Sequence, residues 1–415
     1  MVGSGGREHA LVKKLLESDR VDSVICAPGN GGISCDAECF PVNVMDIDGM
    51  IALAQEQAVD FVFVAPDDPL AAGMVDAFEA KGIKAFGPSA LAARIESSKV
   101  FSKNLMKKYG IPTAAYEVFS DSQAAINYIE SCGKFPLVIK ADGLALGKGV
   151  IIAEDFEAAK DAVKSIMEDK VFGSSGNNIV VEEFLTGPEV SVLAFTDGKT
   201  LVPMVSSMDH KRALDGDNGL NTGGMGTVAP NPYYTKDIAA VCMDTIFMPT
   251  VKAMCSEGCP FKGCLYFGLM LTPDGPKVIE YNSRFGDPET QVVLPLLETP
   301  LVDIVEAVAD ETLDKIDVVF SEDSCACVIM ASGGYPGSYA KGKVINGLET
   351  VEGIVFHAGT AKDNEGRTVT SGGRVLATVA FGDNIAEAAA ASYAMLDGIS
   401  FDGKYNRRDI GKDLM

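Results

Sequence analysis

The chain has 415 residues, 47% of them hydrophobic, which predicts a globular protein of two to four domains. Its formal net charge of −23 excludes a nucleic-acid-binding surface, because such a surface needs clustered positive charge. No uninterrupted apolar run reaches the roughly 18 residues of a membrane-spanning helix, so we expect no membrane segment.

Residues 1–98 alternate helical and strand-like patterns, which predicts a parallel sheet. Helical spacing covers 8–16, and the run at 61–65 is typical of a buried strand. Only Met1 and Val2 precede the first glycine, so we expect the first strand to be missing or very short. The loops after these strands are rich in glycine or proline and should gather at one sheet edge, where ligands bind.

The loop Gly3–His9 (GSGGREH) matches a dinucleotide-binding fingerprint only in part, because Glu8 stands where a third glycine belongs. A helix N-terminus that binds a phosphate explains the pattern more simply. We therefore expect a phosphate rather than a dinucleotide at this loop.

A helical connector over 99–115 precedes a compact α+β unit. Within that unit, three glycines and one lysine fall between two predicted strands, at 141–149. Such a hairpin could cover phosphates with backbone N–H groups and a point charge, although a plain flexible hairpin has the same composition. Lys140 ends the first strand and should point into the same space. The strand at 179–184 places Glu182 at its end, either to hold a nucleoside or simply to link domains.

A long polar loop follows at 209–227, and its five glycines cannot pack a core. Because it is longer than a connection requires, we interpret it as a substrate loop. Further on, Val278, Glu280 and Asn282 are two residues apart, so we expect them to share one face of a strand. A carboxylate beside an amide oxygen suits Mg²⁺, which also binds substrate phosphates. The alternative is a strand that runs into a turn with exposed charges.

Only three histidines are present, and we find no arrangement that indicates a nucleophilic triad. The candidate chemistry rests on cations, glycine loops and carboxylates. Phosphoryl transfer has this requirement, because it depends on positioning and charge neutralisation.

Together these features resemble the ATP-grasp fold, and four motifs resemble the phosphoribosylamine–glycine ligase family in particular. The motifs are GSGGREHAL at 3–11, DHKR at 209–212, NTGGMG at 221–226 and RFGDPE at 284–289. The resemblance covers the whole chain and implies an α/β and α+β multidomain protein. Its parts would be an N-terminal parallel-sheet domain (1–98), an ATP-grasp domain (99–318) with a small lid (116–186), and a small C-terminal α+β domain (319–415).

The resemblance also implies a reaction. ATP, glycine and 5-phosphoribosylamine would give ADP, phosphate and glycinamide ribonucleotide, an early step of purine synthesis. The glycine carboxylate would attack the γ-phosphate to form glycyl phosphate, and the amine of phosphoribosylamine would then displace phosphate. ATP would bind with Mg²⁺ or Mn²⁺.

Site residues carry over by motif. The resemblance implies that ATP phosphates meet Lys99, Lys140, Gly143, Gly147, Lys148 and Gly149. It implies that adenosine is held by Glu182, Glu183, Leu185 and Glu189. It implies that the metal binds Glu280 and Asn282. It implies catalytic or glycine-pocket roles for Arg284, Asp287, Lys211 and Asp209. It implies that ribosylamine meets Gly6, Arg7, Glu8, Asn30, Gly31 and Asp67.

Two departures from the family pattern stand out. Asp67 occupies a position where relatives usually have a longer glutamate, and the strand at 267–270 has no acidic metal ligand. Alternative functions are another ATP-grasp ligase or carboxylase, or a nucleotide-binding module without catalysis. The lack of a signal-peptide pattern and the ten scattered cysteines predict a cytoplasmic protein with thiols packed mostly in cores. We also expect a monomer rather than an oligomer.

Overall fold

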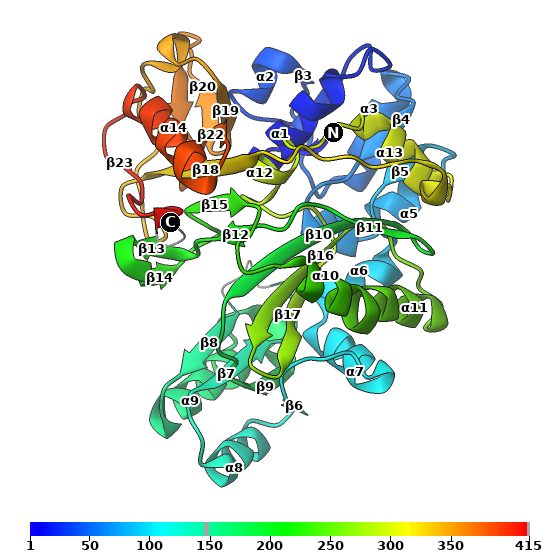
Figure 1. Cartoon of the computed structure of the whole chain (residues 1–415), viewed down its shortest axis with the longest axis vertical. Helices are drawn as coiled ribbons and strands as arrows, with labels where there is room; N and C mark the ends of the chain where they lie inside the picture. The colour runs from blue at the N-terminus through cyan, green and yellow to red at the C-terminus, as the bar shows by residue number, and fades with distance from the viewer. Residues whose placement is uncertain (145–148, 413–415) are drawn as a thin grey trace.

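The computed structural model describes residues 1–144 and 149–412. Figure 1 shows that both ends of the chain build the upper part of the molecule, whereas a smaller unit extends downward from a central sheet. The ten cysteines are free thiols and six of them are buried, as the sequence predicted.

The N-terminal part contains a parallel sheet, which confirms the predicted βαβ pattern. β1 (Val2–Gly3) pairs with β2 (Ile25–Pro28), which pairs with β3 (Glu38–Cys39), and β4 (Phe61–Phe63) pairs with β5 (Lys84–Phe86). A parallel bridge between Val2 and Val64 joins the two sets. β1 is as short as expected. The flanking helices are α1 (Gly6–Leu16), α2 (Ile33–Asp36), α3 (Ile47–Glu56), α4 (Asp67–Ala71), α5 (Met74–Glu79) and α6 (Ala90–Ser97).

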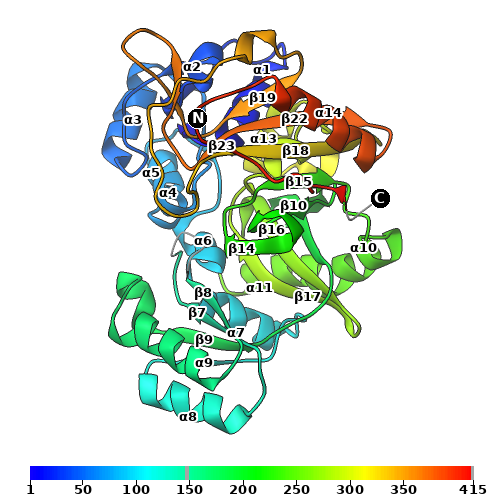
Figure 2. The ribbon, with the colours of Figure 1, turned by 90° about the vertical axis from the view of Figure 1, so that its left-hand side faces the viewer.

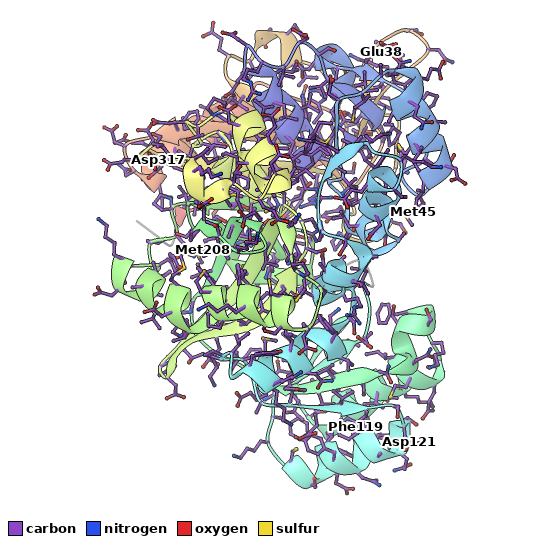
Figure 3. The ribbon with its side chains drawn as sticks, turned by 90° about the vertical axis from the view of Figure 1, so that its right-hand side faces the viewer. Glu38, Met45, Phe119, Asp121, Met208 and Asp317 are labelled. Carbon is purple, nitrogen blue, oxygen red and sulfur yellow. The ribbon has the colours of Figure 1, made fainter. Side chains whose placement is uncertain are left out.

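The lower unit is an antiparallel sheet that follows α7 (Lys99–Tyr109). Its strand order is β6 (Tyr116–Phe119), β9 (Ile179–Glu183), β7 (Leu137–Ala141) and β8 (Val150–Ala153). Ile139 and Val181 pack in one apolar core with α8 (Ser122–Cys132) and α9 (Phe156–Val163). Because strand side chains alternate, Lys140 and Glu182 lie on the opposite face. Figure 3, in which Phe119 and Asp121 mark this unit, shows how it projects from the rest of the molecule.

The central sheet is antiparallel, in the order β11 (Leu201–Pro203), β10 (Glu189–Asp197), β16 (Lys262–Thr272) and β17 (Gly275–Asn282). One face packs on α13 (Leu301–Ala309), and the other packs on α10 (Lys236–Cys242) and α11 (Met248–Ser256). The continuous helix 236–256 has a mean hydropathy of 1.4, which by length and composition alone would suit a membrane span. Here Phe247 packs against Phe267 of β16 with ring centroids 4.3 Å apart, so the helix covers the core.

A bulge interrupts β17 and corrects one prediction. Gly268 pairs with Glu280, but the next residue, Leu269, pairs with Val278, so Ile279 is the extra residue. Val278 therefore faces the apolar core together with Tyr281, and it does not share a face with Glu280.

The C-terminal sheet has the order β12 (Met208–Asp209), β15 (Gly226–Ala229), β18 (Ser324–Ser332), β22 (Arg374–Gly382) and β19 (Ile354–His357), and β23 (Lys404–Tyr405) pairs with β18. α14 (Ile385–Asp397) packs on β18 and β22 (Figure 2). The remaining elements are α12 (Thr290–Val293) and the hairpins β13 (Arg212–Leu214) with β14 (Asn218–Asn221), and β20 (Thr360–Lys362) with β21 (Thr368–Thr370). β12 and β15 come from the middle of the chain, so this sheet carries both ends of the glycine-rich loop.

Candidate active site

Two sheets face each other across the candidate nucleotide site. Lys140 of β7 reaches from the lower unit to β17, where its Nζ donates to the carbonyl of Ile279 at 3.2 Å. The same Nζ lies 3.1 Å from Oε2 of Glu182 on β9. The carbonyl that accepts from the lysine belongs to Ile279, the extra residue of the bulge in β17.

The predicted phosphate-binding residues begin at α7. Lys99 Nζ donates to the carbonyl of Gly143 at 2.6 Å, which ties the start of that helix to the glycine hairpin. Gly149 closes the hairpin by accepting from Ala141 N at 2.8 Å. Burial lowers the pKa of Lys99, although the charge of Glu280 opposes this effect. Gly147 and Lys148 lie outside the described residues.

Glu280 carries a full negative charge in a site rich in cations. Burial alone would raise the pKa of its carboxyl, but Lys211, Lys140 and Lys99 outweigh that effect and lower the pKa. Asn282 Oδ1 accepts from Arg284 Nη2 at 3.2 Å.

The donor set suits a hard cation. Among the described residues there is no cluster of three or more His, Cys, Asp or Glu side chains that could hold a metal by themselves. An ionised carboxylate and an amide oxygen nevertheless fit Mg²⁺, which keeps several waters and shares phosphate oxygens. The site therefore fits a metal that arrives with a polyphosphate.

Arg284 is fixed by carboxylates. Its Nη2 lies 3.1 Å from Glu96 Oε1 and 3.7 Å from Asp67 Oδ2, while its buried Nε has no partner among the described residues. Burial works against the charged guanidinium, but Glu96 and Asp67 outweigh burial and raise the pKa of Arg284. Glu96 also accepts from the Ser283 amide at 2.7 Å. Glu96 is not among the predicted site residues, since nothing in its helix distinguishes it from a surface glutamate.

The N-terminus of α1 differs from the prediction. The Asp287 carboxylate accepts from Arg7 N at 3.2 Å, and the Glu8 carboxylate accepts from Gly5 N. Arg7 Nη1 donates to the Phe285 carbonyl at 3.0 Å. Two of the amides expected to bind a phosphate are thus already bonded to protein carboxylates, because the tertiary fold brings Asp287 to this helix.

The predicted residues at 30 and 31 shape a turn. Asn30 Nδ2 donates to the carbonyls of Ser4 at 2.9 Å and His357 at 2.8 Å, and Gly31 N donates to the Thr360 carbonyl at 3.0 Å. A Cβ on Gly31 would lie 2.9 Å from a backbone carbon of Ala361, so only glycine allows this approach. A Cβ on Gly6 would lie 2.6 Å from Nε2 at the end of the Gln291 side chain, so that side chain would have to move.

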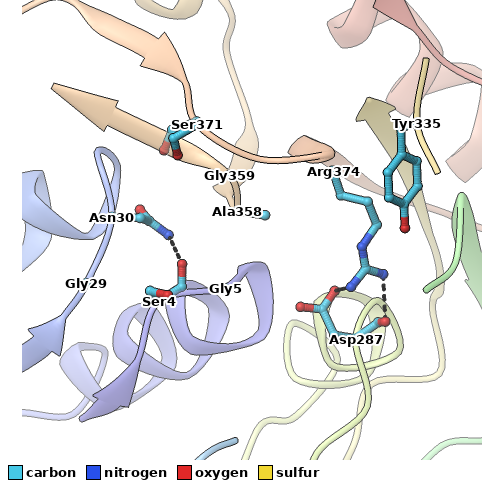
Figure 4. A pocket seen from close by; sticks show the side chains of 11 residues that line it. Ser4, Gly5, Gly29, Asn30, Asp287, Tyr335, Ala358, Gly359, Ser371 and Arg374 are labelled. Carbon is cyan, nitrogen blue, oxygen red and sulfur yellow. Dashed lines mark hydrogen bonds and ion pairs between the residues drawn. The ribbon is translucent and has the colours of Figure 1, made fainter. Parts of the chain in front are cut away.

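A cavity of about 370 Å³ opens beside these turns (Figure 4). It is lined by Ser4, Gly5, Gly29, Asn30, Asp287, Tyr335, Ala358, Gly359, Thr360, Ser371 and Arg374. More than half of this lining comes from the C-terminal part, which the sequence analysis did not assign to the site. The run Ser371–Gly372–Gly373–Arg374 was the one available signal, since it combines a hydroxyl, two glycines and a cation.

The glycine-rich loop brings two more predicted residues to the site. Lys211 Nζ lies 2.8 Å from Glu189 Oε2, and the charge of Glu189 raises the pKa of Lys211 well above its usual value. Asp209 Oδ1 is buried without a partner among the described residues. Burial, together with the nearby charge of Glu289, raises the pKa of Asp209 well above its usual value.

The remaining two predicted residues, Glu183 and Leu185, lie at the end of β9 and just after it. Glu183 Oε1 accepts from Ala115 N at 3.0 Å and from Lys277 Nζ at 3.3 Å, so this exposed carboxylate ties β9 to β17. Leu185 is half-buried just after β9.

Comparison with known families gives matches along almost the whole chain. Models of the phosphoribosylglycinamide synthetase N domain, ATP-grasp (A) domain and C domain match residues 1–96, 97–290 and 325–413. The phosphoribosylamine–glycine ligase of Caldanaerobacter subterraneus subsp. tengcongensis is 48% identical over 411 residues, covering 99% of this chain and 98% of the relative. That of Clostridium acetobutylicum is 44% identical over 412 residues, covering 99% of each.

Solved structures agree with these matches. The crystal structure of the phosphoribosylamine–glycine ligase from Thermotoga maritima has a TM-score of 0.87 and 35% identity, and covers 99% of this chain and 98% of that one. The biotin carboxylase domain of Hydrogenobacter thermophilus 2-oxoglutarate carboxylase has a TM-score of 0.76 at 15% identity, covers 97% of this chain and 90% of that one, and shares the fold alone. The chain therefore belongs to the phosphoribosylglycinamide synthetase family, whose relatives named here are phosphoribosylamine–glycine ligases.

Proposed function

We propose that this chain joins glycine to 5-phosphoribosylamine with cleavage of ATP, giving glycinamide ribonucleotide, ADP and phosphate for purine synthesis. The observation that carries this proposal is the position of Asp287. It follows the strand of Glu280 and Asn282 by a few residues, and it also lines the 370 Å³ cavity. A polyphosphate at Glu280 and a sugar phosphate in the cavity would thus meet at one turn.

The nucleotide lies between the lower unit, which acts as the lid, and β17. In this proposal the phosphates contact Lys99, Lys140, Gly143, Gly147, Lys148 and Gly149. Glu182, Glu183, Leu185 and Glu189 hold the adenosine. Glu182 suits the base because its Oε1 is buried and unpartnered among the described residues, and the exocyclic amine of adenine would donate to it.

The divalent cation binds Glu280 and Asn282, and this oxygen-only donor pair suits either Mg²⁺ or Mn²⁺. When bound, the metal neutralises phosphate charge. Arg284 supplies a positive charge beside Asn282, and the ion pair with Glu96 fixes the position of this guanidinium. These residues therefore position charge where it develops, which is the main requirement of phosphoryl transfer.

The first step forms a bond between a glycine carboxylate oxygen and the γ-phosphorus, and breaks the bond from that phosphorus to ADP. In the second step the ribosylamine nitrogen attacks the glycyl carbonyl carbon, phosphate leaves with its electron pair, and the nitrogen loses one proton. No protein nucleophile is needed. Asp209 and Lys211 bind glycine, since one offers an unpartnered buried oxygen and the other a retained positive charge.

Phosphoribosylamine occupies the cavity. The hydroxyls of Thr360 and Ser371 and the guanidinium of Arg374 are its polar contacts from the C-terminal side. On the N-terminal side, the wall of the cavity is shaped by Gly6, Asn30 and Gly31. This wall is held in place by Arg7 and Glu8. Asp67 contacts Arg284 and acts on the nucleotide side of the turn.

The experiment is ADP release measured with glycine and phosphoribosylamine supplied together and separately. The proposal expects ADP release to need glycine, and glycinamide ribonucleotide to form only when both are present. ADP release that needs neither substrate, or that needs only an unrelated acid or bicarbonate, would favour the alternative ligase or carboxylase. We further propose a monomeric cytoplasmic enzyme with its domains at 1–98, 99–318 and 319–415, which sedimentation and limited proteolysis would test.

A further inference from the structure

A buried lysine that the proposed reaction does not use lies behind the base-binding carboxylate. Lys103 of α7 is 2% exposed, and its Nζ lies 2.8 Å from Glu182 Oε2 and 2.8 Å from Thr113 Oγ1. Lys140 Nζ contacts the same Oε2 at 3.1 Å. Oε2 of Glu182 thus contacts the ammonium groups of both lysines.

The other oxygen, Oε1, is buried and has no partner among the residues that the structure describes. Glu182 itself is 3% exposed. Ile179 and Val181 of the same strand point into the apolar core of the lid, so Glu182 points to the side of α7 and β17. A buried acceptor without a donor costs free energy, so a ligand donor at this point is strongly favoured.

The network also fixes where this acceptor stands. Thr113 Oγ1 donates to the Val278 carbonyl at 2.7 Å, and Thr113 pairs with Val278 in a parallel bridge. Lys103 therefore connects the base end of the site to the strand of Glu280. The rotamer of Glu182 is held relative to the metal-binding strand and not only to the lid.

We propose that Lys103 is a positioning residue that determines base specificity: together with Lys140 it holds Oε2, so the free acceptor Oε1 stays directed at the base and selects a 6-amino purine against a 6-oxo purine. This inference rests on the proposed function, because it places the base of the nucleotide at Glu182. An adenine amine would donate to Oε1. The carbonyl of hypoxanthine or guanine would place oxygen against oxygen, with no proton between them.

The test compares ATP with inosine triphosphate, which carries a 6-oxo group in place of the amine. The quantity measured is the ratio of kcat/KM for the two nucleotides, with glycine and phosphoribosylamine saturating. Lys103→Met keeps the length of the side chain but removes its charge, so Glu182 retains only the Lys140 contact at Oε2 and can turn. The ratio is expected to fall at least about tenfold. Lys107→Met is the matched control, since Lys107 is exposed on the same helix, and its ratio is expected to equal that of the parent.

A second variant keeps the proposal testable if Lys103→Met does not fold. In Glu182→Gln the carbonyl oxygen would face the two lysines and the amide NH₂ would face the base, so the preference should shift toward inosine triphosphate. Equal losses with both nucleotides in Lys103→Met and in Glu182→Gln would show a merely structural role and overturn the inference. Failure of the proposed function is a separate outcome, because the parent itself would then show no glycine-dependent ADP release.

Discussion

The guanidinium of Arg374 lies 3.2 Å from the Asp287 carboxylate and joins the C-terminal sheet to the turn after β17. The same side chain donates to the carbonyls of Asp287 at 2.8 Å and of Gly224 at 3.4 Å. Figure 4 shows this pair at the cavity wall. One arginine therefore sets the position of two motifs that are far apart in the sequence.

Replacing Arg374 with alanine should release both motifs at once. We expect kcat/KM for phosphoribosylamine to fall about a hundredfold, because small misplacements of substrate-positioning groups have effects of this size. Steady-state ADP release at varied phosphoribosylamine is the measurement. Arg367→Ala is the control, since that guanidinium is 52% exposed and pairs with Asp363 and Glu365 of its own turn. Parent-like kinetics in Arg374→Ala would contradict the assignment of the cavity.

Glu280→Gln tests the metal site. The substitution keeps the shape and removes the charge that Lys211, Lys140 and Lys99 stabilise. We expect kcat to fall at least about a hundredfold and the half-saturating Mg²⁺ concentration to rise, because charge stabilisation at the phosphates is lost. ADP release titrated with MgCl₂ measures both. Glu117→Gln on the exposed side of the lid should change neither, and an unaltered Mg²⁺ response in Glu280→Gln would refute the site.

Arg407 is a third target, because it holds the glycine-rich loop from the C-terminal part of the chain. It is 2% exposed, donates to both oxygens of Asp409 at 2.8 Å, and reaches the Arg212 carbonyl at 3.1 Å. Arg407→Ala should lower the free energy of unfolding by about 3 kcal/mol. It should also lower kcat, since Lys211 adjoins the loosened hairpin.

Urea unfolding and ADP release, both at low temperature, separate the two effects of Arg407→Ala. The neighbouring Arg408→Ala provides the control, because its guanidinium is 58% exposed and such an ion pair contributes little. If Arg407→Ala unfolds like the parent, the buried guanidinium does not hold the loop.

His357 should make the stability of the folded protein depend on pH. Burial, with the charges of His9 and Lys362, lowers its pKa to about 3. The unfolded chain, with a pKa of about 6.5, then binds more protons than the folded chain below that pH, so stability falls as the pH is lowered. Between pH 7 and pH 5 this histidine should cost about 2 kcal/mol of unfolding free energy. From pH 7 to pH 5 the unfolding free energy of His357→Phe should therefore fall by about 2 kcal/mol less than that of the parent. Urea unfolding at each pH measures both proteins. Equal decreases in unfolding free energy would contradict the predicted effect.

Much of the fold was predictable because its signals are local. The βαβ order of the first 98 residues, the short first strand and the two strands on either side of the glycine run at 141–149 follow from apolar periodicity and glycine placement, and the described residues contain each of them. The bulge at Ile279 was not predictable, since a bulge depends on how the partner strand pairs and leaves no mark in the alternation of Val278, Glu280 and Asn282.

The candidate site, like the fold, has features that were predictable from the sequence and features that were not. The sequence by itself determined the chemistry: a carboxylate and an amide two residues apart, lysines beside glycine-rich turns, and an arginine after the strand. Only the tertiary structure decided which groups meet. It placed Glu96 behind Arg284, capped α1 with Asp287 and lined the cavity with Arg374 from the C-terminal sheet. The physical reason is that residue type and spacing fix charge and hydrogen-bonding capacity locally, whereas contacts across hundreds of residues depend on how whole sheets pack.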